Sequence, residues 1–373
     1  MKKVLIAAEI FEPDIGGPAT YGKKIAEELT NRGFDVSLVC YSNKKEKDNY
    51  NFKITRVLRG RNSLSRYLKY FFTILKLGKD VDVIYAQGPV GSGLPVIMAN
   101  FILKKKVIVK VVGDYAWEQA RGLKVTDMGI DEFQNKNFGG KIGRLKNIES
   151  FVCKKASKVI TPSNYLKNIV KGWGVPESQI IVVYNSATLP QVSRQESDSD
   201  IILSIARLVP WKGFSLLIDL IPELLKVNPK FYLQILGDGP DKEKLQQQIK
   251  DLNLEDKISI KLVDHRQRDE ILSRTNLFVL NTGYEGLSHT ILETFAAGVP
   301  VITTNIGGNP ELIENGVNGI LVEHNNKEEI KKAILELYAN SELRQKFVIK
   351  SKEVLNKFTA ERMINDTIKV LQG

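Results

Sequence analysis

The chain has 373 residues, of which 43% are hydrophobic and 26% are charged. One core rarely supports this length, so size and composition predict a soluble globular protein of two domains. The two cysteines, Cys40 and Cys153, show no metal or redox spacing. This excludes a disulfide framework and makes a reducing, cytoplasmic setting the simplest expectation. No stretch is long and apolar enough to predict a transmembrane helix.

The net charge of +11 is concentrated in the first half of the chain. Residues 1–185 carry 31 Lys and Arg against 17 Asp and Glu, whereas residues 186–373 carry 23 against 26. A basic half beside a slightly acidic half indicates an anionic partner for the first half. Nucleic acid, acidic lipid and a phosphorylated acceptor are the candidates.

The first half alternates apolar strands with helical patterns. KKVLIAAEI, at residues 2–10, predicts a strand, because its apolar run breaks at Glu9 and is too short for a signal peptide. An amphipathic helix follows at 20–32 and closes at Gly33. Further strands are expected at 34–42, 81–88, 106–114 and 157–163. Continuous apolar strands that alternate with helices indicate a parallel sheet covered on both faces.

The second half repeats this pattern. Strands are expected at 200–208, 231–239, 257–264, 277–283 and 300–305, and helices at 216–227, 242–252 and 289–298. The polar, aperiodic stretch 191–200 is the expected linker. We therefore predict two Rossmann-like α/β domains that face each other across a cleft, with ligands at the carboxyl ends of the strands.

A glycine pair follows the first strand. Gly16 and Gly17 precede a helix, and neighbouring glycines let a backbone approach a phosphate or sugar while the positive helix end attracts the anion. A plain strand–helix turn is the alternative. The pair is not the dinucleotide fingerprint, because its glycines are adjacent. A second glycine run, at 88–93, is weaker and has no clear strand–helix context.

Two cations follow the first strand of the second half. Arg207 lies at the strand end, and Lys212 lies just before Gly213 and a helix. Strand-end cations suit a diphosphate, since Arg offers a fork and Lys a mobile point charge. Two solvated surface cations are the alternative. The LGDGP turn at 236–240 is expected to be structural.

The stretch EGLSHTILETFAAGVPVITTNIGGNP, at 285–310, holds two glutamates eight positions apart, neither with an obvious local cationic partner. Ser288 is a plausible N-cap, so Glu293 lies inside a helix and Glu285 in the loop before it. Glu293 could accept a hydrogen bond from a ribose hydroxyl. Glu285 would lie beside the group attached to the far end of a bound diphosphate. Free amides that could hold an anion belong to Gly286, Leu287, Ser288, His289 and Thr290.

These motifs together resemble the retaining, GT-B-fold glycosyltransferases of group 1, also called family 4. The matches, in the family's order, are the F-x-P-x-x-G-G loop ending at Gly17, ARL with Lys212-Gly213, LGDGP at 236–240, E-x7-E at Glu285 and Glu293, and GG-x-PE at 307–311. They cover residues 4–322. The resemblance implies a hexosyltransferase that uses a UDP or GDP sugar in polysaccharide or glycolipid biosynthesis of the cell envelope.

The resemblance also implies roles for the donor-site residues. Arg207 and Lys212 would hold the diphosphate, and the amides of residues 286–290 would hold the distal phosphate. Glu293 would bind the ribose and Glu285 the sugar hydroxyls. Gly17 would cover the phosphate from the first domain.

On the acceptor side, Gly16 and Tyr21 are the candidates. The expected domains are an acceptor-binding domain at 1–188, a donor-binding domain at 189–355, and a last helix at 356–373 that packs back on the first domain.

One departure from the family concerns a histidine that many members carry at the end of a first-domain strand. The corresponding stretch here, KVVGDYAWE, has none, because His265, His289 and His324 all lie in the second half. Asp114 is the candidate to replace that contact with the donor sugar. A helix-cap or structural role is the alternative.

Retention without an obvious nucleophile suggests same-face substitution, in which the departing diphosphate accepts the acceptor's proton. Catalysis would then rest on positioning and on stabilising the leaving charge. No cofactor or metal is expected, because a helix end and two cations supply what a divalent ion would. The Asp80-Val81-Asp82 triplet resembles a metal-binding D-x-D but precedes a strand.

Residues 56–80 combine basic residues with an apolar stripe. Tyr67, Phe71, Ile74 and Leu75 are either core residues or part of an interfacial helix on anionic lipid. The expected location is cytoplasmic, with peripheral attachment to the inner face of the membrane as an option.

Two other classes compete with a glycosyltransferase. A nucleotide-sugar epimerase of the same architecture would need acid and base residues near the sugar, and the lack of histidine in the first domain argues against it. A nucleic-acid-binding protein is suggested by charge alone, and the zinc, helix-turn-helix and aromatic signatures of that class are missing. We therefore expect no nucleic-acid partner.

Overall fold

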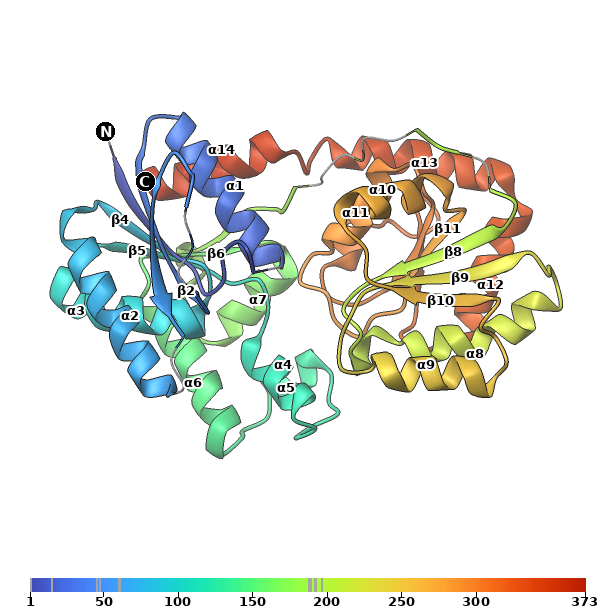
Figure 1. Cartoon of the computed structure of the whole chain (residues 1–373), viewed down its shortest axis with the longest axis horizontal. Coiled ribbons are helices and arrows are strands. Elements are labelled where there is room, and N and C mark those ends of the chain that lie inside the picture. The colour runs from blue at the N-terminus through green and yellow to red at the C-terminus, as the bar shows by residue number, and fades with distance from the viewer. Residues whose placement is uncertain are drawn as a thin grey trace. The chain divides into compact units, whose positions relative to one another are not determined.

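The computed structural model forms two compact α/β units (Figure 1). One unit comprises Met1–Val183 with Met363–Gly373, and the other comprises Tyr184–Arg362. We call them unit 1 and unit 2. The structure describes residues 2–14, 16–44, 46, 48–59, 62–186, 190, 193–195 and 197–373.

Unit 1 is built on a seven-stranded parallel sheet in the order β3-β2-β1-β4-β5-β6-β7. Its strands are β1 (Lys3–Ala7), β2 (Asp35–Ser42), β3 (Lys53–Leu58), β4 (Val83–Ala86), β5 (Lys106–Lys110), β6 (Lys158–Thr161) and β7 (Ile180–Val182). Its helices are α1 (Gly17–Asn31), α2 (Ser63–Leu77), α3 (Leu94–Leu103), α4 (Tyr115–Gly122), α5 (Ile130–Gln134), α6 (Gly140–Lys155), α7 (Asn164–Gly172) and α14 (Ala360–Gln372).

The core of unit 1 follows the period-two alternation of its strands. Val107, Val109 and Val111 point to one face of the sheet, where they meet buried residues of α2, α3 and α6. Ile108 of the same strand is equally buried on the other face. Burial on both faces explains why the centre of β5, Val107 to Val109, is continuously apolar rather than alternating with polar residues.

Unit 2 repeats this architecture with a six-stranded parallel sheet in the order β10-β9-β8-β11-β12-β13. Its strands are β8 (Asp200–Ile205), β9 (Phe231–Leu236), β10 (Ile258–Lys261), β11 (Leu277–Leu280), β12 (Val301–Thr304) and β13 (Ile320–Val322). Its helices are α8 (Phe214–Leu225), α9 (Lys242–Asp251), α10 (His265–Arg274), α11 (His289–Ala296), α12 (Lys327–Ala339) and α13 (Ser341–Leu355). Two apolar clusters, one on each face, form its core.

The predicted fold class, with two Rossmann-like domains, is confirmed. Each sheet has one point where successive strands stop adding to one edge and continue from the other. This topological switch lies between β1 and β4 in unit 1 and between β8 and β11 in unit 2. Ligands of open parallel sheets bind at the carboxyl ends of the strands that flank such a switch.

The chain leaves unit 1 after Val183, five residues before the predicted boundary. Part of the predicted linker, 191–200, lies outside the described residues. Its described part belongs to unit 2, since the Arg194 guanidinium donates to the carbonyls of Leu272 (3.2 Å) and Thr275 (2.5 Å).

The last helix, α14, belongs to unit 1 from Met363 onwards. Lys106 Nζ, at the start of β5, donates to the carbonyl oxygen of Val370 at 2.8 Å, and Lys2 Nζ donates to that of Gln372 at 2.8 Å. Phe358, before this helix, packs in the core of unit 2 instead. Within the described parts of the chain, no helix is long and apolar enough to cross a membrane.

Candidate functional site

The site in unit 2 lies at the topological switch. The loop after β8 ends in a single 3-10 turn, η4 (Pro210–Lys212), and the loop after β11 carries Glu285. Because β8 and β11 are neighbours, their carboxyl ends bring these loops together. Lys212 Nζ donates a hydrogen bond to Glu285 Oε1 and another to the carbonyl of Tyr284 at 3.2 Å. The Lys212 and Glu285 side chains are only 12% and 17% exposed.

Backbone contacts fix this pair in place. The N–H of Gly283 donates to the carbonyl of Trp211 at 2.6 Å, and the Asn281 side-chain amide donates to the carbonyl of Gly213 at 3.1 Å. Gly213 has a φ of 56°, and a Cβ there would overlap the Asn281 side chain. Only glycine therefore fits between η4 and the end of β11.

The double glycine at 307–308 supports the Glu285 loop from behind. The N–H of Gly308 donates to the carbonyl of Glu285 at 2.9 Å. A Cβ on Gly307 would overlap the Glu285 carbonyl oxygen, and one on Gly308 would overlap that of Gly286. Because these residues are glycines, the loop at 307–308 packs directly against the backbone of the Glu285 loop. This contact fixes the position of Glu285.

Several backbone amides that follow Glu285 lack a hydrogen-bond acceptor among the described residues. In the part of the chain that the structure describes, the N–H groups of Gly286, Leu287, Ser288 and Thr290 donate to no protein acceptor. Ser288 is the N-cap of α11, as predicted, and its hydroxyl accepts from the N–H of Ile291 at 3.3 Å. The Leu287 side chain is buried in the core, whereas His289 is exposed. Open amides at a helix start form an anion-binding site.

Glu293, on α11, has a cationic partner that the sequence did not reveal. Arg268 Nη1, on α10, lies 2.9 Å from Glu293 Oε2, and the two side chains are 15% and 16% exposed. Burial raises the pKa of Glu293, and the Arg268 charge opposes this shift. Both glutamates of the E-x7-E element are thus paired by residues distant in sequence, Lys212 and Arg268. No periodic signal marks Arg268, because it meets Glu293 only through tertiary packing.

Arg207 is exposed after the end of β8. Its guanidinium forms no ion pair and no hydrogen bond with any residue that the structure describes. The predicted role in holding a diphosphate therefore stays a prediction, for which the side chain is accessible.

The glycine pair of unit 1 also lies at a topological switch, after β1. Gly16 is the N-cap of α1, and its carbonyl accepts from the N–H groups of Ala19 (3.0 Å) and Thr20 (3.1 Å). A Cβ on Gly17 would meet no atom within 4 Å. The space in front of Gly17 is open within the described residues, as a phosphate-covering loop requires.

Glu9 is a candidate that the sequence analysis missed. Its Oε1 accepts from the N–H of Gly91 at 2.7 Å and from that of Ser92 at 3.3 Å. These amides belong to η2 (Pro89–Gly93), a π-helical turn between β4 and α3, so the expectation that the 88–93 glycine run lacks a strand–helix context is wrong. Burial raises the pKa of Glu9, which the two N–H donors oppose. Its position directly after the first strand was the available signal.

Tyr21, proposed for the acceptor side, is a core residue of unit 1. Its hydroxyl lies 2.9 Å from the Tyr85 hydroxyl and 3.4 Å from that of Thr367 on α14. Lys110 Nζ lies 3.2 Å from the centroid of the Tyr21 ring. The side chain is only 9% exposed, so its position argues for packing rather than acceptor binding.

Asp114 takes the alternative role considered for it. It is the N-cap of α4, where Oδ1 accepts from the N–H of Trp117 at 2.7 Å. Oδ2 accepts from the Gln134 side-chain amide at 2.7 Å, and the residue is 1% exposed. Both oxygens are occupied, so the structure favours the helix cap over a contact with the donor sugar.

The comparisons with known proteins divide the chain in the same way. Residues 15–189 match the model of glycosyltransferase family 4, and residues 185–354 match that of the glycosyl transferases group 1. The chain belongs to the group 1, GT-B-fold glycosyltransferases. The family resemblance of the motifs is confirmed, and so is the prediction of a transferase.

Relatives of this glycosyltransferase match most or all of its length. The uncharacterized glycosyltransferase MJ1178 of Methanocaldococcus jannaschii is 27% identical over 99% of this chain and 98% of its own. The N-acetylgalactosamine-N,N'-diacetylbacillosaminyl-diphospho-undecaprenol 4-alpha-N-acetylgalactosaminyltransferase of Campylobacter jejuni is 26% identical over 84% and 83%. HepE of Anabaena, solved in complex with UDP-glucose, has a TM-score of 0.78 at 17% identity and full coverage of both chains.

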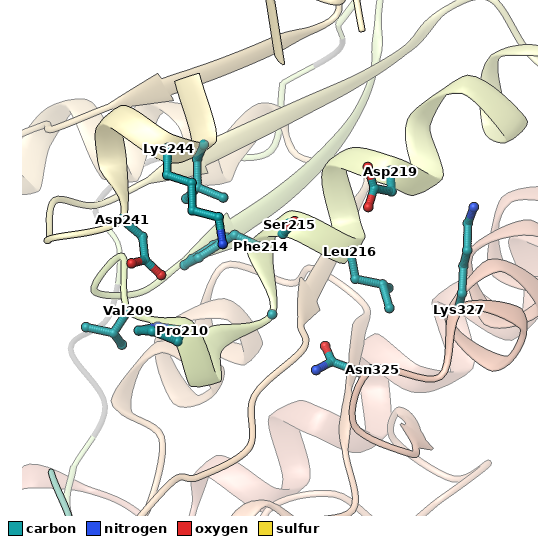
Figure 2. Close-up of a pocket in the computed structure, with 12 residues that line it drawn as sticks. Val209, Pro210, Phe214, Ser215, Leu216, Asp219, Asp241, Lys244, Asn325 and Lys327 are labelled. Atoms are coloured by element: carbon teal, nitrogen blue, oxygen red, sulfur yellow. The ribbon is translucent and has the colours of Figure 1, made fainter. Parts of the chain in front are cut away.

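A pocket of about 620 Å³ opens at the N-terminus of α8 in this glycosyltransferase (Figure 2). Val209 and Pro210 form one side, Asp241 and Lys244 approach from the start of α9, and Asn325 approaches from the loop before α12. Its lining includes Val209, Pro210 and Gly213 of the loop around η4 but not Lys212, Glu285 or Glu293, so the pocket borders the site at the switch point without containing these three side chains. Among the described residues, no group of three His, Cys, Asp or Glu side chains could hold a metal ion.

Proposed function

We propose that this glycosyltransferase moves a sugar from a nucleoside-diphosphate sugar to a glycan or a lipid-linked acceptor, with retention of the anomeric configuration. The observation that carries the proposal is the Lys212–Glu285 pair beside the amides of Gly286, Leu287, Ser288 and Thr290, which donate to no acceptor among the described residues. These groups place a cation, a carboxylate and several N–H donors at the topological switch of unit 2, where a parallel sheet binds its ligand.

The donor's pyrophosphate fits the positive groups of this site. The amides of Gly286 to Thr290 would hold the distal phosphate, and Arg207 would reach the pyrophosphate from the exposed end of β8. Glu293 would accept a hydrogen bond from the ribose. The structures of HepE in complex with UDP and with UDP-glucose support a donor of this class.

Lys212 and Glu285 would act together on the leaving group and the sugar. The ammonium of Lys212 orients the Glu285 carboxylate toward the sugar hydroxyls and remains near the developing charge on the departing diphosphate. One preorganised donor in a dry site lowers the barrier by about 3–4 kcal/mol. Lys212 and Arg207 would each supply a contribution of this kind, so a metal ion is not required.

Retention follows from the leaving group. Glu285, the carboxylate of the switch-point site, is paired with Lys212. We propose that the acceptor attacks from the face that the diphosphate leaves, and that a phosphate oxygen takes the acceptor's proton. Relatives named for α-linked products, an N-acetyl-alpha-D-glucosaminyl L-malate synthase and a poly(ribitol-phosphate) alpha-N-acetylglucosaminyltransferase, support this stereochemistry.

An anionic acceptor matches the charge of the first half of the chain. Residues 1–185 carry 31 basic against 17 acidic residues. Two relatives are named for phosphate-bearing acceptors, a diphospho-undecaprenol-linked sugar and poly(ribitol phosphate). A lipid-linked diphosphate or a phosphate-rich glycan is therefore the acceptor class that we propose.

A thermal-shift panel of UDP, GDP and ADP sugars tests the donor class, because a ligand that binds the native state raises its melting temperature. One nucleotide sugar should stabilise the wild type. Arg207→Ala and Lys212→Ala should lose that stabilisation and at least about a hundredfold in transfer, while Lys332→Ala, an exposed lysine of α12, should retain both. Wild-type turnover in either site variant would rule out the proposed donor site.

The reaction itself is tested by following the anomeric proton of the product by NMR. The same configuration in donor and product supports retention, and inversion would overturn it. Donor conversion to an epimer without an acceptor would instead identify an epimerase.

A further inference from the structure

An apolar surface is exposed on two neighbouring helices of unit 1. On α2, Leu64, Leu68 and Phe72 recur at four-residue spacing and are 65%, 48% and 62% exposed. On α3, Met98, Phe101 and Ile102 are 46%, 57% and 68% exposed. We call these six side chains the apolar face. Contiguous exposed apolar side chains of this kind mark an interaction site.

The apolar face is additional to the core of unit 1. The core side of α2 carries Tyr70, Phe71, Ile74 and Leu75, all of which pack in the apolar cluster beneath it. Of the two alternatives for the stripe of Tyr67, Phe71, Ile74 and Leu75, core packing therefore holds for the last three residues. The exposed row of α2 lies on another side of the helix, since residues four positions apart share one side.

The exposed apolar residues of α3 are more unusual than those of α2. Its sequence, LPVIMANFIL, contains no charged residue, and a helix that is apolar all round is normally buried. Val96, Ile97 and Ala99 are buried in the core, but Phe101 and Ile102 are more than half exposed. The outer side of α3 therefore fits an environment that is not water.

The two helices lie side by side on one face of the sheet (Figure 1). At their C-terminal ends they touch, because a Cβ on Gly78 would lie 2.6 Å from Leu103 Cδ1. Their apolar rows both point away from the sheet, since the opposite sides of both helices are buried in the core. The two rows therefore lie on adjacent helices and face away from the same sheet.

Lysines surround this surface and lack acidic partners. They are Lys69, Lys76 and Lys79 around α2, and Lys104 and Lys105 at the end of α3. None of the five forms an ion pair with a carboxylate in the described part of the chain. Residues 49–79 and 83–113 contain no Asp or Glu at all. An apolar centre with a basic rim is typical of a surface that rests on anionic lipid.

We propose that the apolar face and its lysines dock unit 1 on the surface of an anionic phospholipid bilayer. Phe72, Phe101 and Ile102 would enter the boundary between headgroups and acyl chains, and the lysines would contact the lipid phosphates. A second copy of the chain would bring the same unpaired lysines against each other, which favours an anionic partner. The inference does not depend on the proposed reaction.

Co-sedimentation with vesicles tests this docking. Wild-type protein should bind vesicles of phosphatidylcholine mixed with phosphatidylglycerol at low salt, and should bind phosphatidylcholine alone far more weakly. Binding should weaken at high salt, because exposed charges are then screened. Failure to bind phosphatidylglycerol vesicles at low salt would overturn the proposal.

Two pairs of variants locate the surface. Phe72→Gln/Phe101→Gln should weaken partitioning at least about tenfold through lost apolar burial, whereas Val227→Gln/Ile349→Gln, 58% and 60% exposed on unit 2, should not. Lys104→Gln/Lys105→Gln should weaken it about 25-fold, since each basic residue near the lipid contributes a factor of roughly five. Lys332→Gln/Lys346→Gln is the matched control.

Each variant is checked for its melting temperature and for its thermal shift with the donor, which separates this inference from the proposed reaction. Unchanged vesicle binding in both surface variants would overturn the proposal. Sedimentation velocity distinguishes a protein partner: a dimer that Phe72→Gln/Phe101→Gln converts to monomer, without any vesicle binding, would assign the face to a second copy.

Discussion

The Arg268 guanidinium on α10 lies 2.9 Å from the Glu293 carboxylate on α11. The exposed fraction of each side chain is less than a fifth. Burial alone would favour the protonated acid, and it raises the pKa of Glu293. The Arg268 charge opposes that shift and fixes the direction of the carboxylate. Arg268 is therefore a positioning residue for the glutamate that we assign to the ribose.

Replacing Arg268 with Leu should push the pKa of Glu293 further up. Because the raised pKa makes Glu293 take up its proton as pH falls from neutral, donor binding by the carboxylate should fail at a higher pH in Arg268→Leu than in the wild type. The pH profile of the donor KM measures this shift. Arg268→Lys, which keeps the charge, should restore much of the wild-type profile.

The same experiment in a Glu293→Gln background is the control, because this side chain has no proton to exchange. The acid-side limb of the KM profile should vanish whether residue 268 is Arg or Leu. An acid-side limb that persists in Glu293→Gln would assign the titration to another group.

Gly307→Ala should damage the site through the backbone of Glu285. Its φ of 64° strains any other residue, and the added Cβ would overlap the Glu285 carbonyl oxygen. Gly316→Ala is matched in strain, with a φ of 74°, but its Cβ would meet no atom within 4 Å. Gly316→Ala should lose about 1–2 kcal/mol of stability through strain alone. Gly307→Ala should lose more than this because of the overlap, and it alone should lose about tenfold or more in kcat. Equal activity in the two would show that the glycine serves the turn alone.

Gly17→Ala tests whether the glycine loop of unit 1 approaches a phosphate. The Cβ would meet no atom of the described residues within 4 Å, so the protein should fold with an unchanged melting temperature. Gly122→Ala, on α4, has the same free space and serves as the control. Transfer should fall only in Gly17→Ala, by about tenfold or more, because a backbone that approaches a ligand leaves no room for a side chain. Full activity in Gly17→Ala would remove Gly17 from the site.

The stability of unit 1 should fall as pH rises above the usual glutamate range. Glu149 on α6 accepts from the N–H groups of Tyr115 (2.8 Å) and Ala116 (3.2 Å), beside Asp114. Burial, then the Asp114 charge, raises the pKa of Glu149 well above 4.5. The folded state thus holds a proton that the unfolded chain releases near pH 4.5, so the free energy of unfolding declines from there to the raised pKa.

Glu149→Gln should flatten this decline, since glutamine has no proton to release. Chemical denaturation at a series of pH values measures the slope. Glu177→Gln is the contrasting control, because Lys171 and Lys167 lower the pKa of this fully exposed carboxyl to about 2. It should leave the decline in place. A wild-type stability that rises over the same pH range would contradict the assignment.

Much of the fold could be predicted because a buried parallel strand can be recognised from the apolar pattern of its own residues. The run at 106–110 is apolar on both faces of the sheet, and so are the runs that became β1, β8 and β11. The missed strands are short or lie at sheet edges. β3 mixes polar with apolar residues without a regular period, and β7 and β13 have three residues each. Such segments gain their structure from the neighbouring strand rather than from their own pattern.

The sequence motifs predicted which residues belong to the candidate site, but not how their side chains pair. Lys212 and Glu285 could be assigned to one site because each follows a strand of the same sheet. Their direct ion pair could not, nor could the pairing of Arg268 with Glu293, since these contacts form only when distant loops are brought together. Tyr21 and Asp114 were proposed as site residues because the sequence near them does not show that they are buried. Their burial is set by α14 and by Gln134, far along the chain.

The end of the chain completes the unit that its beginning starts. Met363–Gly373 belongs to unit 1, and Thr367 reaches the Tyr21 hydroxyl. During translation, the ribosome must therefore finish all of unit 2 before unit 1 receives its last helix. A fragment that stops at residue 183 should remain incompletely folded, and a synthetic peptide of residues 360–373, added in trans, should help it to assemble.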